Sequence, residues 1–173
     1  MTPPAERPLI LTLRFDEASF GRFDAMRRRH FPAERNHIPA HLTLFHALPG
    51  HAEPEIVRTL AEIAGRTAIL HFAVRKLRFL GYGSAFVVDS APLAALRREL
   101  ADHFAPLLGR QDAAGFSPHV TIQNKAPAKE AKTLFAELQA GFTPFEAQGT
   151  GLLLWRYLGG PWGAAGEFAF AAP

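Results

Sequence analysis

Two short segments, His41-Leu42-Thr43-Leu44 and His119-Val120-Thr121-Ile122, carry the same order of histidine, apolar residue, threonine and apolar residue. One segment lies in each half of the 173-residue chain. Side chains alternate between the two faces of a β-strand, so each segment predicts a strand with an apolar back and a His–Thr pair on its front. Two imidazoles that face one substrate can serve as its general base and general acid. The repeated pattern therefore predicts a paired-histidine site.

A single His-x-Thr pattern is weak, because it arises by chance in many chains of this composition. Its repetition inside two apolar, strand-like segments is more specific. The alternative is that both histidines pack or cap within a sheet, and that both threonines simply favour strands.

The composition is that of an ordinary globular protein, with 48% hydrophobic and 20% charged residues. We expect one domain over residues 1–173, and the length also allows two pseudo-repeated lobes. The formal net charge is only +3, which favours a small anionic ligand over long nucleic acid. The chain has no cysteine, so disulfides and cysteine-bound zinc are excluded. No apolar run is long enough to span a bilayer, and the first eight residues show no signal-peptide pattern. These features predict a cytoplasmic protein with no membrane partner.

Apolar periodicity predicts the same order of elements in both halves: strand, helix, motif strand, helix and further strands. The expected helices cover about 17–31, 53–64, 90–107 and 127–140, and the expected strands 9–15, 41–48, 68–80, 85–89, 119–124, 144–148, 151–158 and 167–171. This order indicates an α+β fold of two pseudo-two-fold lobes. We expect two antiparallel sheets that face a central cleft, with helices on their outer faces.

The motif segments, extended to Phe45, Pro49-Gly50 and the preceding Phe116-Ser117-Pro118, resemble the 2H phosphoesterase superfamily. The branch that looks most similar contains the 2′-5′ RNA ligase-like proteins and the RNA 2′,3′-cyclic phosphodiesterases. The segment 152–162, which reads LLLWRYLGGPW, is similar to the closing strand and turn of that branch.

The resemblance implies that His41 and His119 are the catalytic pair and that Thr43 and Thr121 hold the substrate phosphate. It leaves open which histidine is the acid and which the base. Relatives often place an arginine five residues after the second motif histidine, where this chain has Asn124 followed by Lys125. Lys125 is therefore a candidate substrate-binding residue.

Three aromatic residues, Phe45, Trp155 and Tyr157, are further candidates for substrate binding, because aromatic rings stack on nucleobases. The alternative is that they belong to a phenylalanine-rich core or its rim.

Four histidines at positions 37, 41, 46 and 51 raise the alternative of a metal site. Strand alternation, however, places His46 on the face opposite His41. The acid–base scheme itself requires no metal ion, so we expect no cofactor.

These observations predict an enzyme: a metal-independent phosphoesterase that opens 2′,3′-cyclic phosphates at RNA ends or on small nucleotides. The reverse reaction, 2′-5′ RNA ligation, would use the same residues. The expected partner is an RNA end or a small cyclic nucleotide, and the expected state is a monomer. The alternatives are a catalytically silent module that binds an RNA end or a phosphate, and an enzyme for another class of cyclic phosphate.

Overall fold

The computed structural model describes residues 7–171. Most of the N-terminal segment on which the signal-peptide expectation depends lies outside them. The helices are α1 (Glu17–His30), α2 (Glu53–Gly65), α3 (Ala91–Phe104), α4 (Arg110–Ala113) and α5 (Ala128–Gly141). The strands are β1 (Leu9–Phe15), β2 (Thr43–Leu48), β3 (Leu70–Phe79), β4 (Ser84–Asp89), β5 (His119–Gln123), β6 (Phe145–Tyr157) and β7 (Trp162–Ala169).

The strands form one antiparallel sheet in the order β2-β1-β6-β3-β4-β5, with β7 paired to β6. The α+β class and the antiparallel pairing are confirmed. The two expected sheets are joined into one, because residues 144–158, which the sequence divides into two strands, form the single long strand β6. One end of β6 pairs with β3 and the other with β1 and β7.

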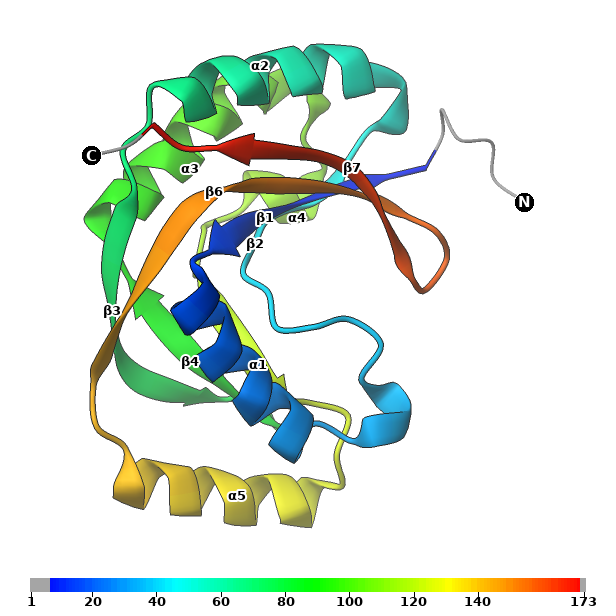
Figure 1. Cartoon of the computed structure of the whole chain (residues 1–173). Coiled ribbons are helices and arrows are strands. Elements are labelled where there is room, and N and C mark those ends of the chain that lie inside the picture. Colours follow the sequence, from blue (N-terminus) through cyan, green and yellow to red (C-terminus); the bar gives the residue numbers. More distant parts are fainter. Residues whose placement is uncertain (1–6, 172–173) are drawn as a thin grey trace.

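The two strands that carry the histidine pattern, β2 and β5, are the two ends of the sheet order. We call them the motif strands. Figure 1 shows α2 and α3 at one end of the molecule, α5 at the other, and β3 and β4 running between these ends. The sheet is strongly curved, so its two terminal strands approach each other from opposite ends.

The helices cross between the two halves of the sheet. Helix α1 follows β1 but packs mainly on β5, whereas α3 and α4 follow β4 and contact β2. Local sequence starts these helices where expected, since Asp16 caps α1 through the backbone N–H of Ser19 and Ser90 caps α3 through that of Leu93. Each helix thus follows a strand near one end of the sheet order and packs on the motif strand at the other end. This arrangement brings the two motif strands close together.

The apolar backs of both motif strands lie in the core. Leu42 and Leu44 from the first segment, and Val120 and Ile122 from the second, are at most 1% exposed. The alternation read from the sequence is therefore confirmed at these positions. Among residues 7–171, no helix is both long enough and apolar enough to cross a membrane.

Candidate active site

His41, Thr43, His119 and Thr121 line one cleft of about 250 Å³, which we call the histidine cleft. His119 begins β5, whereas His41 lies two residues before β2 begins. The structure thus brings the four motif side chains together from the two ends of the sheet.

Both motif histidines are oriented by the backbone in the same way. Nδ1 of His41 lies 2.9 Å from the carbonyl oxygen of Pro39, and Nδ1 of His119 lies 2.9 Å from that of Ser117. A carbonyl oxygen can only accept a hydrogen bond, so each Nδ1 carries the proton. Each Nε2 is then the ring nitrogen left for a ligand in the cleft, as an acceptor in the neutral ring and a donor in the charged one.

The surroundings of His41 favour its neutral form. Burial lowers the pKa of His41 to about 4; the hydrogen bond to the Pro39 carbonyl opposes this shift, and the charges of Arg27, His119 and His46 add to it. The indole of Trp162 also packs edge-on against the His41 ring, with the centroids 4.9 Å apart. The His41 ring is therefore a proton acceptor at neutral pH.

Two buried arginines hold the motif strands. Arg27 of α1 donates to the carbonyl of Thr121 at 3.1 Å, and Arg97 of α3 donates to that of Leu44 at 2.8 Å. Each arginine reaches the motif strand on which its own helix packs. Arg27 is buried, although the next two residues of this basic run, Arg28 and Arg29, are exposed.

The expectation that His46 faces away from His41 is also wrong, because His46 lines the histidine cleft. The pairing of β1 with β2 shifts register at this point, from Thr12–Thr43 to Leu11–Phe45. Leu44 and Phe45 are consequently both buried, and His46 after them is exposed. A second register shift follows between Phe45 and Leu48, where Ala47 is exposed as well. A β-bulge of this kind inserts one residue and returns the following side chain to the earlier face.

His46 is held by Asp112, a buried residue of α4. One carboxylate oxygen of Asp112 accepts the backbone N–H of His46 at 2.8 Å and lies 3.2 Å from its Nδ1, and the other accepts the N–H of Ala47 at 2.9 Å. Burial alone would raise the pKa of Asp112, but the hydrogen bonds from His46 and Ala47 outweigh it, so the net shift is downward. Nothing in the sequence singles out Asp112, which falls in a predicted loop.

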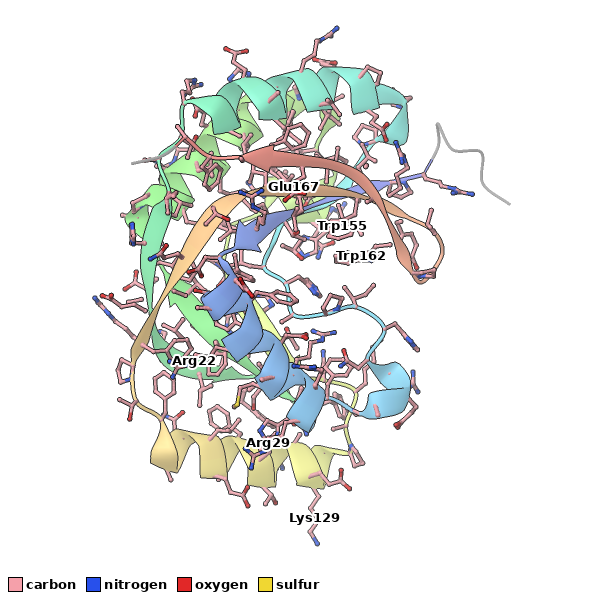
Figure 2. All side chains as sticks on the ribbon, viewed as in Figure 1. Arg22, Arg29, Lys129, Trp155, Trp162 and Glu167 are labelled. Atoms are coloured by element: carbon pink, nitrogen blue, oxygen red, sulfur yellow. The ribbon has the colours of Figure 1, made fainter. Side chains whose placement is uncertain are left out.

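Next to the histidine cleft lies a second, largely apolar cavity of about 410 Å³, which we call the tryptophan pocket. His41 and Trp162 line both cavities, and Trp155 lines only the second. Both tryptophans lie on the inner side of the β6–β7 hairpin, away from α2 (Figure 2). The Trp155 ring is fixed by its N–H, which donates to the Thr12 hydroxyl at 3.0 Å.

The other sequence candidates lie elsewhere. Phe45 is 0% exposed and packs under Arg97 and against Phe104, so no base can stack on it. Lys125 is exposed in a left-handed backbone conformation, with φ of 59°, and lies outside both cavities. Tyr157 is exposed and also lies outside them. Of the four histidines considered for a metal, only His41 and His46 line the histidine cleft, and residues 7–171 contain no group of three His, Asp or Glu side chains that could hold an ion.

Comparison with known proteins gives a consistent result. The family model of the 2′-5′ RNA ligase superfamily matches residues 15–161. Solved structures of similar fold include TT0787 of Thermus thermophilus, with a TM-score of 0.68 and 18% identity over 94% of this chain and 97% of that one. They also include apo LigT of E. coli, with a TM-score of 0.63 and 15% identity over 95% and 98%. LigT complexed with 3′-AMP gives 0.60 and 17% over the same shares. No curated protein matches the chain.

Proposed function

Because the chain belongs to the 2′-5′ RNA ligase superfamily, we propose that it opens 2′,3′-cyclic phosphates at RNA ends or on small nucleotides by metal-independent catalysis with His41 and His119. The observation that carries the proposal is the shared cleft, in which two imidazoles from opposite ends of the sheet each direct Nδ1 to a backbone carbonyl. The family contains ligases and phosphoesterases, which supports an enzyme over a silent phosphate-binding module.

In the proposed reaction, Nε2 of neutral His41 takes a proton from water as the water oxygen attacks phosphorus. The bond from phosphorus to one ribose oxygen breaks, and protonated His119 gives its proton to that oxygen. The lowered pKa of His41 supports its role as the base. A bound phosphate anion favours the charged ring and so raises this pKa during the reaction. The product is a ribose phosphomonoester. If an RNA 5′-hydroxyl takes the place of water and the 3′ oxygen leaves, the same steps form a 2′-5′ phosphodiester, which is ligation.

Thr43 and Thr121 are proposed to donate hydrogen bonds to the non-bridging phosphate oxygens, which stabilises the charge that develops there. The tryptophan pocket is proposed to receive the nucleobase, since indole rings stack on bases and this pocket opens beside His41. Trp162, which the sequence candidates omit, replaces Phe45 and Tyr157 as the second aromatic contact beside Trp155. A role for Lys125 in binding more distant phosphates stays a prediction.

Three broader predictions come from the sequence: one domain over residues 1–173, a monomer, and a cytoplasmic location. The continuous sheet supports the first, because its hydrogen bonds run through both lobes.

Turnover of a panel of nucleoside 2′,3′-cyclic phosphates in EDTA tests the function. We expect the wild type to open at least one of them and His41→Ala to lose nearly all of that activity. Full activity in His41→Ala would contradict the mechanism. Loss of wild-type activity in EDTA, restored by one added metal ion, would contradict its independence of metals.

A further inference from the structure

His46 is a third imidazole in the histidine cleft, and the proposed reaction does not use it. Its backbone and its ring both bind the Asp112 carboxylate, so its orientation is fixed from two directions. The carboxylate accepts a hydrogen bond from Nδ1, which therefore carries the proton. Nε2 is left for a ligand. The side chain is about half exposed, whereas that of Asp112 is 2% exposed. Buried Asp112 thus fixes the orientation of His46, whose ring remains accessible from the cleft.

The two side chains around His46 that are charged at neutral pH, Arg97 and Asp112, carry opposite charges. Besides Asp112, the charged or titratable groups that line this cleft are Arg97, His41 and His119. Arg97 donates to the backbone carbonyls of Leu44 and Asp112, so its hydrogen bonds are directed into the protein. Arg97 and Asp112 offset each other in charge. A protonated His46 therefore adds a net positive charge that an anionic ligand would neutralise.

The two sides of the cleft differ in polarity. On the side of Trp162 the cleft continues into the apolar tryptophan pocket. The other lining includes His46, Gln111, Asp112 and Arg97. A substrate with its base in the apolar pocket and its cyclic phosphate between the two motif histidines leaves the polar side for a further polar substituent.

We propose that His46 is a specificity-determining residue whose Nε2 binds a second phosphate of the substrate. The preferred substrate would then carry a phosphate besides the cyclic one, as an RNA 3′ end or a 5′-phosphorylated nucleotide does. This inference rests on the proposed function for the position of the cyclic phosphate, and it adds the chemical class of the substrate.

His46→Asn is the sharpest variant, because the Asn side-chain amide can still donate to Asp112 in place of Nδ1 while Nε2 is removed. Its matched control is His103→Asn, a substitution at an exposed histidine of α3 outside both cavities. The substrates are adenosine 2′,3′-cyclic phosphate, its 5′-phosphorylated form and an adenylyl dinucleotide that ends in the cyclic phosphate. The last two distinguish a free phosphate from an RNA backbone phosphate.

We expect kcat/KM of the wild type to be about tenfold higher with the second phosphate than without it. His46→Asn should remove this preference, mainly through KM, and His103→Asn should keep it. An unchanged preference in His46→Asn, or no preference in the wild type, would overturn the inference.

A binding measurement separates this inference from the proposed function. Titration calorimetry compares 3′-AMP with adenosine 3′,5′-bisphosphate, and we expect tighter binding of the bisphosphate that depends on His46. If no cyclic phosphate is turned over but this dependence is present, the proposed function fails and the inference stands. If turnover is present and neither turnover nor binding depends on His46, the inference fails alone.

Discussion

The two motif strands hold their histidines alike but surround them differently. In both, Nδ1 meets the carbonyl two residues earlier, and a register shift after the threonine buries two successive residues, Leu44-Phe45 in β2 and Ile122-Gln123 in β5. After the bulge of β2, the side chain of His46 lines the cleft. The residue after the bulge of β5 is Asn124, whose side-chain oxygen accepts the backbone N–H of Lys125. The backbone thus orients the two imidazoles in the same way, and the neighbouring side chains give them different surroundings.

The largest effect should come from removing either imidazole. We expect His41→Ala and His119→Ala each to lower turnover of a cyclic phosphate by roughly 10²–10⁴-fold, the range for loss of a general acid or base. A p-nitrophenyl phosphodiester distinguishes the two, because its leaving group needs no proton. On this ester His119→Ala should keep much more of the wild-type activity than His41→Ala does. The opposite result would exchange the roles of base and acid.

The two buried arginines test whether the motif strands are held equally firmly. Arg97 makes both of its hydrogen bonds to backbone carbonyls, whereas Arg27 makes one to Thr121 and one to the side chain of Asn36. Arg97→Met should therefore lower the free energy of unfolding more than Arg27→Met, by about 2–4 kcal/mol against about 1–2 kcal/mol. Urea denaturation of both variants measures the difference. Equal losses would show that the two strands are held to the same extent.

The pH dependence of stability tests the asymmetry of His41. The pKa of histidine in an unfolded chain is about 6.5, and in the folded protein that of His41 is about 4. Between these values the unfolded state binds a proton that the folded state does not. The contribution of His41 to the free energy of unfolding is therefore fully present above about pH 6.5. It is lost as pH decreases toward 4, by about 2 kcal/mol for this partly exposed ring.

Urea denaturation at a series of pH values checks this expectation. His41→Gln should flatten the slope in part, because burial also lowers the pKa of His30, which acts in the same direction. His103→Gln, an exposed control, should keep the slope of the wild type. An unchanged slope in His41→Gln would mean that His41 titrates normally.

The smallest effects should come from the two threonines. Thr43→Val and Thr121→Val each remove one hydroxyl and keep the shape of the side chain. Each should weaken binding of inorganic phosphate by about 1 kcal/mol, roughly fivefold. Calorimetric titration measures both. Unchanged affinity in one variant would assign phosphate binding to the other strand alone.

Much of this arrangement could be predicted from the sequence, because the signals are local. The apolar backs of the motif strands, the helix caps at Asp16 and Ser90 and the repeated His-x-Thr pattern depend on neighbouring residues. The same local reasoning fails at His46, since one inserted residue reverses every later side chain of a strand and the bulge forms against β1. Local reasoning also divides β6 in two, at a weak stretch that includes Gly149 and Gly151. In the structure β6 continues through this stretch because it pairs with three other strands.

The sequence by itself determined the apolar backs of the two motif segments, the identity of the paired imidazoles and the family. Only the tertiary structure decided how the chain uses them. The crossed helices bring the two ends of the sheet together, bury Arg27 and Arg97 behind the motif strands, and place Asp112 against His46. These contacts join residues far apart in the chain, and burial by such distant partners sets the pKa of His41. No pattern along the sequence encodes it, because desolvation depends on everything that packs around the ring.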